Sequence, residues 1–446
     1  SFTGVIQNGS GTGSVLALVK TGTGVQTLAG GTANTHTGGT TVLGGTLRLN
    51  KTAGVNALTG SITVGDGSAS AVLLLVAGNQ IADTSVVTLG GSGATAGVLR
   101  MNARVETIAG LSSSTAGNGV VENETGSAST ATLTLNLAGN TTQIYSGILR
   151  DGDGVGTDGA LIIVKSGDGV QVLAGDSTHS GGTTINAGTL VVGSGGATGS
   201  LGSGGIVNNG TLVVNRTGEL AFTQAITGNG SVVMGGSGTV VLSGNSNTYS
   251  GGTIVDQGTL RVMNASGSAT GIGMVTIGNG ATLSGTGSVA GQTNINVGGM
   301  LSVGHNVSAG QTMTLSGGLF SAGILALDLW ANAGGVNGNA NADILTIGGG
   351  VVTLTGTLQL TNSGGISSWA VGDSWKLIDW GALGASDRTV AFDTLSLPNI
   401  GGSLAWDTSM LAQTGYITIV PEPGRMMLGL PGLAALGVRR RRTAAL

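Results

Sequence analysis

The feature that most constrains the fold of this chain is an internal repeat. Each copy has two adjacent glycines followed by threonine, then a Gly-Thr-Leu triplet. Three segments align without gaps: residues 36–50 (HTGGTTVLGGTLRLN), 179–193 (HSGGTTINAGTLVVG) and 249–263 (YSGGTIVDQGTLRVM). The similarity extends upstream, and the full units cover residues 2–50, 145–193 and 222–263. A unit repeated in this way predicts a solenoid, in which each copy buries its apolar face against the next.

Apolar and polar residues alternate within each copy at the period of a β-strand. In residues 189–192 (TLVV) the second and fourth side chains share one face. The third faces outward, where the sister copies carry Arg48 or Arg261. Glycine fills 89 of 446 positions and the first proline is Pro398, which suits tight corners and continuous ladders. We therefore predict an all-β fold with a parallel β-helix over residues 1–320. Coils of roughly 20–25 residues would give about fourteen coils and a rod on the order of 65–70 Å long.

Two of the three histidines begin a repeat and are therefore candidate ligands or bases. His36 and His179 occupy one slot, which the third copy fills with Tyr249. Because tyrosine would not serve in the same ligand or base role, we predict a half-exposed ring that caps a corner. His305, in SVGHNVSAG, is expected to be a turn residue. The chain has no cysteine, which excludes disulfides, a thiolate nucleophile and a cysteine metal site.

The segment LVKTGTGVQTLAG with the following THTGGTTVLGGTLRLN resembles the autotransporter-associated β-strand repeat, also called the passenger-associated transport repeat. That pattern has a strand ending in Lys-x-Gly-x-Gly, then Leu-x-Gly-x-x-x-Tyr-x-Gly-Gly-Thr and Gly-Thr-Leu. Lys20 and Lys165 match its lysine, whereas Met234 replaces it in the third copy. The resemblance implies a right-handed β-helix passenger on a bacterial surface. The chain departs from such passengers in the C-terminal quarter, which lacks the alternating strands of a translocator barrel.

Composition changes near residue 320, beyond which all five tryptophans lie. Short alternating runs between residues 324 and 420 read as antiparallel strands. We expect residues 321–420 to form a small β-rich unit that closes the open end of the β-helix. The tryptophans are predicted to form the core of this unit rather than a platform for sugars: Trp330, Trp369, Trp375, Trp380 and Trp406.

Residues 421–446 have the order proline break, apolar run and basic cluster, which resembles the PEP-CTERM sorting signal. The break is Pro421, Glu422 and Pro423, and the basic membrane stop is Arg439, Arg440, Arg441 and Arg442. The resemblance implies a transient partner, a membrane transpeptidase of the exosortase type, which removes or replaces the tail. The positive-inside rule places the arginines in the cytoplasm and the body outside.

The apolar run between the break and the arginines, residues 426–438, is expected to form a short C-terminal helix. As a helix it would span roughly 20 Å, whereas a bilayer core needs roughly 30 Å. Pro431 also interrupts it. A short anchor or an amphipathic tail therefore stays as the alternative to a sorting signal. Residue 1 is serine and no charged-then-apolar leader follows, so a secretory signal is expected to have been removed or left out.

A β-helix enzyme would need acidic and basic side chains converging from neighbouring coils. The best candidate is the segment RDGDGVGTDGALIIVK, which carries Arg150, Asp151, Asp153, Asp158 and Lys165. It loosely resembles a calcium loop, but Ile162 stands where the bidentate glutamate is expected. The aligned loops of the sister copies have no acids. We therefore predict a variable turn, with no catalytic residue, no metal and no cofactor.

The charge balance of 16 basic and 20 acidic residues leaves no basic stripe for nucleic acid. The favoured hypothesis is a non-catalytic structural or adhesin-like protein. It would be exported to the cell surface, outer membrane or extracellular matrix of a Gram-negative-type bacterium. Its expected partners are an exopolysaccharide or cell-surface glycan, and the membrane through the tail before processing. The alternative is a β-helix protein that binds or degrades a polysaccharide.

Overall fold

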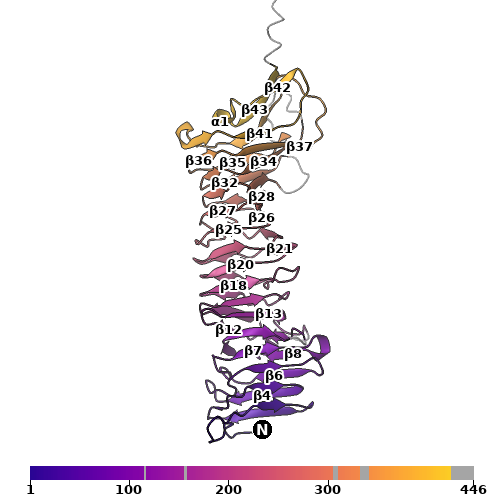
Figure 1. Ribbon diagram of the computed structural model, residues 1–446, viewed down its shortest axis with the longest axis vertical. Helices are drawn as coiled ribbons and strands as arrows, with labels where there is room; N and C mark the ends of the chain where they lie inside the picture. Colours follow the sequence, from indigo (N-terminus) through magenta and orange to yellow (C-terminus); the bar gives the residue numbers. More distant parts are fainter. Residues whose placement is uncertain (115–116, 155–157, 305–309, 332–340, 423–446) are drawn as a thin grey trace, which may run out of the picture.

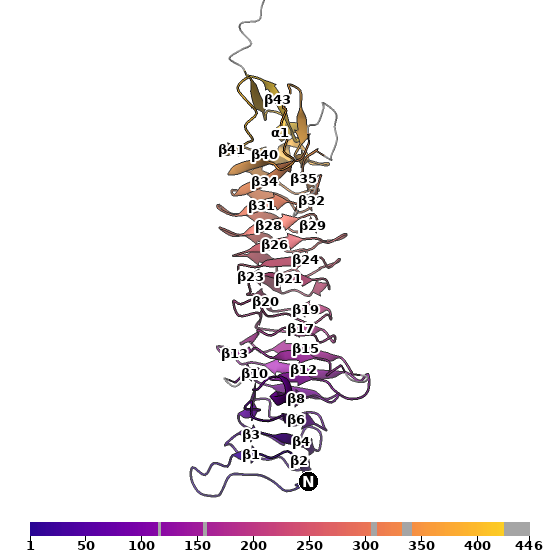
Figure 2. The ribbon, with the colours of Figure 1, turned by 90° about the vertical axis from the view of Figure 1, so that its right-hand side faces the viewer.

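The computed structural model describes residues 1–114, 117–154, 158–304, 310–331 and 341–422. The chain winds into a long rod of stacked coils, with the N-terminus at one end and the strands after residue 400 at the other (Figures 1 and 2). Six parallel sheets run along the rod and a small antiparallel sheet lies at its C-terminal end. The prediction of an all-β parallel β-helix is confirmed.

Three sheets build the N-terminal half, and their strands are given in hydrogen-bonded order. Sheet 1 is β1 (Leu18–Lys20), β3 (Thr40–Val42), β5 (Ile62–Val64), β7 (Val86–Leu89) and β10 (Gly110–Ser113). Sheet 2 is β2 (Val25–Gly30), β4 (Gly45–Lys51), β6 (Ala71–Leu75), β8 (Gly97–Arg100), β11 (Val120–Glu122) and β14 (Ile148–Arg150). Sheet 3 is β9 (Val105–Ile108), β12 (Ala131–Asn136), β15 (Leu161–Ser166), β17 (Thr183–Ile185), β19 (Ile206–Asn208) and β22 (Ile226–Thr227).

Three further parallel sheets continue the rod. Sheet 4 is β13 (Thr142–Tyr145), β16 (Val170–Leu173), β18 (Thr189–Val192), β20 (Thr211–Val214), β23 (Ser231–Met234), β25 (Thr253–Val255), β27 (Val275–Ile277), β30 (Thr293–Ile295), β33 (Leu319–Ser321), β36 (Val352–Leu354) and β40 (Arg388–Val390). Sheet 5 is β21 (Glu219–Phe222), β24 (Thr239–Leu242), β26 (Thr259–Val262), β28 (Thr282–Gly285), β31 (Met300–Val303), β34 (Ile324–Leu329), β37 (Thr357–Asn362) and β41 (Thr394–Ser396). Sheet 6 is β29 (Ser288–Val289), β32 (Thr312–Leu315), β35 (Ile344–Ile347) and β39 (Ile378–Asp379).

The core is a set of aliphatic columns that run the length of the rod. Leu47, Leu73 and Leu99 stand in register on β4, β6 and β8, and each is at most 1% exposed. The residues between them along each strand face outward, as in the alternating pattern of β6. No coil could bury this face alone, so stacking on the next coil supplies the hydrophobic stabilisation.

Coil length varies more than the sequence predicts, while the strand register is kept. Val275 of β27 pairs with Thr293 of β30 after a short coil, whereas Leu319 of β33 pairs with Val352 of β36 after a much longer one. The extra residues of the long coil lie outside the strands of sheet 4, so the core columns are not displaced.

The prediction of antiparallel strands beyond residue 320 is wrong for most of them. β34, β37 and β41 extend sheet 5 in parallel register, and β36 and β40 extend sheet 4. An alternating pattern reports which face is buried and not the direction of the partner strand. The change of composition near residue 320 therefore does not mark the end of parallel stacking.

Sheet 7, which is antiparallel, lies at the C-terminal end of the rod (Figure 1). Its strands are β38 (Ser374–Lys376), β43 (Tyr416–Pro421) and β42 (Leu404–Asp407). A one-turn helix, α1 (Leu411–Thr414), precedes β43 and ends at Gly415, whose φ of +82° suits glycine. The short apolar helix expected at residues 426–438 lies outside the described residues.

Candidate functional site

The first slot of the repeat holds a buried ring that hydrogen-bonds the threonine four residues later. The ring atom and the threonine Oγ1 are 3.2 Å apart for His36–Thr40, 3.1 Å for His179–Thr183 and 2.6 Å for Tyr249–Thr253. All three rings are 0% exposed, so the expectation of a half-exposed ring is wrong. Burial lowers the pKa of His179 to about 4, which keeps the ring neutral near pH 7. The slot is structural, and no solvent reaches it. His305 lies outside the described residues.

The glycines of the repeat are required by close backbone approach and by left-handed backbone conformation. A Cβ on Gly181 would lie 2.5 Å from the carbonyl oxygen of Leu161 on the preceding coil. Gly182 has φ of +87° and Gly188 has φ of +67°. A Cβ on Gly188 would also lie 2.4 Å from the oxygen of Gly167. The Gly-Gly-Thr and Gly-Thr-Leu signatures therefore encode corners between coils, and no ligand is needed to explain them.

The lysine of the repeat caps a turn from inside. Lys165 is fully buried, and its Nζ donates to the backbone oxygens of Ser166, Gly167 and Ala187 at 2.8, 2.6 and 3.2 Å. Lys20 makes the same three bonds in the first copy, to Thr21, Gly22 and Gly44. Burial lowers the pKa of Lys165 to about 8. Lys165 therefore does not join the acidic residues of its segment.

A charged stack on sheet 2 is the feature nearest to an enzymatic constellation. Glu122 of β11 pairs in register with Arg100 of β8 and Arg150 of β14. Its two carboxylate oxygens lie 2.8 Å from Arg100 Nη2 and 2.6 Å from Arg150 Nη2, and its side chain is 1% exposed. Arg100 also contacts Glu124 at 2.6 Å. Two arginines and two glutamates compensate one another across three coils.

Of the residues singled out in the segment RDGDGVGTDGALIIVK, Arg150 joins this stack. Asp151 instead fixes the loop by accepting hydrogen bonds from the backbone N–H groups of Leu161 and Ser180, at 2.9 and 3.0 Å. Burial raises the pKa of Asp151, but these bonds outweigh it and hold the pKa below its usual range. Within the described ranges no group of three or more His, Asp or Glu side chains is placed to hold a metal. Asp153 and Asp158 add no such group.

Sequence reasoning missed Arg100 and Glu122. The coil that leads from Glu122 to Arg150 is longer than the coil that leads from Arg100 to Glu122. A fixed coil length would not have aligned them. Their strands (GVLR, VVE, ILR) each end in a charged residue, and this was the signal available.

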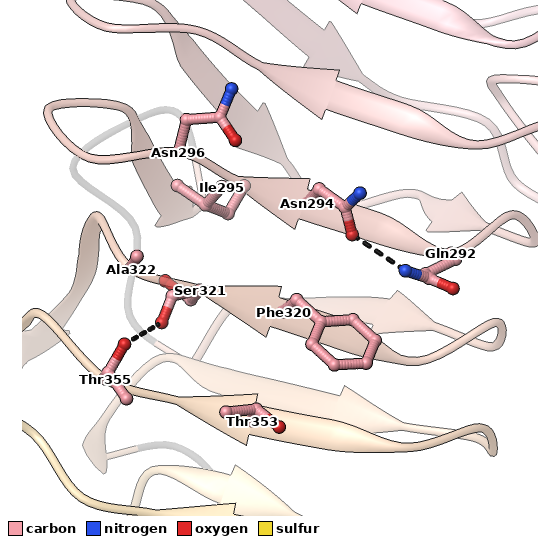
Figure 3. Close-up of a pocket in the computed structure, with 9 residues that line it drawn as sticks. All are labelled: Gln292, Asn294, Ile295, Asn296, Phe320, Ser321, Ala322, Thr353 and Thr355. Atoms are coloured by element: carbon pink, nitrogen blue, oxygen red, sulfur yellow. Dashed lines mark hydrogen bonds between the residues drawn. The ribbon is translucent and has the colours of Figure 1, made fainter.

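A shallow groove of about 380 Å³ lies on the outer face of sheet 4, across β30, β33 and β36 (Figure 3). Its central residue is Phe320, whose side chain is 39% exposed between Asn294 and Thr353 of the flanking strands. The remaining outward lining residues are Gln292, Asn296, Ala322 and Thr355. This groove was not anticipated, because it combines residues from three coils of unequal length.

The tryptophans of the C-terminal region lie mainly inside it. Trp375 is 1% exposed and Trp380 is 4% exposed. Their Nε1 atoms donate to the backbone oxygens of Ala331 and Leu411, at 2.8 and 3.0 Å. Trp375 also packs against Trp369 and Trp406, and the ring centroids lie 5.7 and 5.5 Å apart. The core role predicted for them is confirmed. Trp330 is half-buried and donates from Nε1 to Asp343.

Only the first two residues of the expected sorting motif fall in the described part of the chain. Pro421 ends β43 opposite Leu404, and Glu422 N–H donates to Ser403 at 3.1 Å. Pro423 and the four arginines, Arg439 to Arg442, lie outside it. No helix within the described ranges is long and apolar enough to cross a membrane.

Comparison with known proteins identifies the repeats. The family model of the passenger-associated-transport-repeat matches residues 18–49, 163–192 and 232–262. The chain therefore carries three of these repeats, and each match falls within a unit found from the sequence.

Two known proteins align with longer parts of this chain. The Adhesin BmaC autotransporter of Brucella suis biovar 1 (strain 1330) is 34% identical over 144 residues, which is 32% of this chain and 4% of that protein. The chain thus spans a small fraction of its relative. The crystal structure of the Haemophilus influenzae Hap adhesin aligns with 92% of this chain and 64% of that chain, at 13% identity and a TM-score of 0.27.

Proposed function

We propose that this chain is a non-catalytic, adhesin-like rod exported to the surface of a Gram-negative-type bacterium. The observation that carries the proposal is the set of three passenger-type repeats, together with 34% identity to an autotransporter adhesin. Structural contacts of the repeat residues that could carry chemistry support the non-catalytic part of the proposal. The rings, lysines and glycines of the repeats make structural contacts within and between coils. The outward side chains also differ between copies, as at Val191 and Arg261, and the outward surface is where a surface protein would meet its partner.

The enzymatic alternative rests on the charged stack, and its geometry disfavours it. A glycan-cleaving site needs two carboxylates free to act as acid and base or nucleophile. Glu122 is held between Arg100 and Arg150, and Glu124 is held by Arg100. We therefore assign the stack a role in joining three coils. Release of oligosaccharide from an acidic polysaccharide, abolished by Glu122→Gln, would revive the alternative.

Delivery to the surface is proposed to depend on the C-terminal tail. Pro421, Glu422 and Pro423 would be read by an exosortase-type transpeptidase while the tail sits in the membrane, with Arg439 to Arg442 on the cytoplasmic side. The body would then stay on the cell surface or enter the extracellular matrix. Peptide mass spectrometry of the native protein tests this. A C-terminus at residues 421–423 supports sorting, whereas recovery of the intact RRRRTAAL end from the membrane fraction overturns it.

The adhesive role is tested in the native cell. Deletion of the gene is expected to lower attachment of cells to glycan-coated and abiotic surfaces, and re-expression of the full chain is expected to restore it. Re-expression of a chain with Glu122→Gln serves as the control for an enzymatic contribution, and at an equal amount of protein on the cell surface it should restore attachment equally, because the change also weakens a buried ion pair. Unchanged attachment in the deletion strain would refute an adhesive function.

A further inference from the structure

We propose that the groove around Phe320 is a binding site for a neutral glycan that lies parallel to the rod axis. The assignment rests on the proposed adhesive function, because it names a ligand class and a site for it. Four features of the groove carry it: its three-row architecture, its aromatic centre, its lack of charge and its position on closed strands.

The groove is built from three rows of outward side chains, one from each coil. The first row presents the carboxamides of Gln292, Asn294 and Asn296, because residues two apart on a strand share a face. The second row is Phe320 and Ala322, and the third is Thr353 and Thr355. The register of β30, β33 and β36 stacks the rows directly, with Asn294, Phe320 and Thr353 in one column.

The aromatic centre is exposed by its neighbours in the row. Ala322, which lies two residues along from Phe320, has only a methyl group, so the ring of Phe320 stands clear on that side (Figure 3). Phe320 remains 39% exposed although a ring of its size would be expected to bury itself. An aromatic face carries partial negative charge and attracts the polarised C–H groups on the apolar face of a sugar ring.

Polar groups flank the ring on both coils, and their remaining donors and acceptors can exchange hydrogen bonds with sugar hydroxyl groups. A carboxamide both donates and accepts, and so does a threonine hydroxyl. Gln292 Nε2 donates to Asn294 Oδ1 at 2.9 Å, which orders the first row. The three rows cover two coil steps, about 10 Å along the rod. The site is therefore long enough for a short oligosaccharide lying along the stack.

Charge and strand geometry select this ligand over others. Among the described residues that line the groove none is charged, so a uronic acid or sialic acid would find no counter-ion. An extended peptide would need an unpaired strand edge, whereas β30, β33 and β36 are paired on both sides. A flat apolar surface of a second copy would bury the remaining donor and acceptor groups of the groove's carboxamides without supplying partners for them.

The test uses the full chain and saturation-transfer difference NMR with four tetrasaccharide probes. Cellotetraose, maltotetraose and the tetramer of N-acetylglucosamine are neutral, and tetragalacturonate is acidic. A groove this open is expected to bind with a Kd on the order of 1 mM. Phe320→Ala should weaken binding of a neutral probe at least tenfold, and Phe320→Leu, which keeps the apolar bulk without the ring, should weaken it similarly.

The matched control is Ile254→Ala. Ile254 lies three strands away in the same outward column of sheet 4 and is 41% exposed. It should leave both binding and the melting temperature unchanged. Equal binding by the Phe320→Ala chain, binding of tetragalacturonate alone, or binding of no probe by the unaltered chain would each overturn the assignment.

Cell attachment separates this proposal from the adhesive function. If attachment depends on the protein but Phe320→Ala does not affect it and no probe binds, another surface mediates adhesion and only the glycan site falls. If a neutral probe binds at Phe320 but deletion of the gene leaves attachment unchanged, the glycan site stands and the adhesive function falls.

Discussion

The substitution His179→Tyr is expected to remove most of the acid sensitivity of the second repeat. His179 has a pKa of about 4 in the folded chain, whereas the ordinary value is 6.5. Below pH 6.5 the imidazole of His179 binds a proton in the unfolded chain but stays neutral in the folded chain, so the free energy of unfolding falls as the pH falls. The shift corresponds to about 3 kcal/mol in full, and to about 2.5 kcal/mol between pH 7 and pH 4.5.

Tyrosine should be accommodated because the third repeat already carries it. Tyr249 is 0% exposed and hydrogen-bonds Thr253 in the geometry that His179 uses with Thr183. Burial raises the pKa of Tyr249 far above its usual value, so its ring stays neutral throughout the acid range. Because tyrosine is larger than histidine and the site is packed, we expect the variant to be less stable than the unaltered chain by about 1–3 kcal/mol at pH 7, and this cost does not depend on pH.

The assay is amide hydrogen exchange, because coils of a solenoid open locally rather than as one unit. Peptides covering β17 and β18 should lose about 2.5 kcal/mol of protection free energy between pH 7 and pH 4.5 in the unaltered chain, and much less in the variant. Peptides covering β25 and β26, beside Tyr249, are the internal control and should lack this loss. An unchanged acid loss around β17 in the His179→Tyr chain would refute the reasoning.

Four further substitutions test a turn cap, two glycines and a buried carboxyl group. Lys165→Met, which copies Met234 of the third repeat, removes three hydrogen bonds to turn carbonyls and should lower local stability by about 2 kcal/mol, measured by exchange of the turn after β15. Gly188→Ala should lower the stability by about 2 kcal/mol or more, because φ is +67° and the new Cβ would meet two carbonyl oxygens. Gly195→Ala, with φ of +89° but open space around the new Cβ, should lower it by about 1 kcal/mol, and the melting temperatures of the two variants test the difference. Burial raises the pKa of Glu106 to about 7, so the stability that its protonation contributes is present below pH 4.5 and is lost as the pH rises through 7. Chemical denaturation at pH 5 and pH 8 should therefore show Glu106→Gln losing about 2.5 kcal/mol less than the unaltered chain over this range.

The inward half of this fold could be predicted from the sequence. Alternation identified the core residues of β18, and the shared Gly-Gly-Thr and Gly-Thr-Leu spacing identified the corners. The interchange of His179 and Tyr249 showed that their slot is structural. The burial of the ring could not be predicted, because alternation gives the side of a strand and says nothing about how a corner turns a side chain beneath the next coil.

The outward half could not be predicted, because it depends on register between coils of unequal length. Asn294, Phe320 and Thr353 form one column although they are far apart in the sequence and unevenly spaced along it. Likewise, Arg100 and Glu122 lie side by side although a whole coil separates them in the sequence. A periodic pattern cannot place such residues, because each loop inserted at a corner changes the number of residues between stacked strands without changing which strands stack.

The placement of the repeats indicates that repetition here serves folding rather than recognition. In the second copy the Gly-Thr-Leu strand, β18, lies in sheet 4; in the third copy sheet 4 holds the preceding strand, β25, and the Gly-Thr-Leu strand β26 has moved to sheet 5. Val191 and Arg261, equivalent in sequence, therefore face different sides of the rod. A ligand that lies along one side of the rod therefore cannot contact the equivalent residues of both copies. Recognition must then use surfaces that the repeat does not dictate, and the groove at residues 292–355 lies beyond the last match, which ends at residue 262.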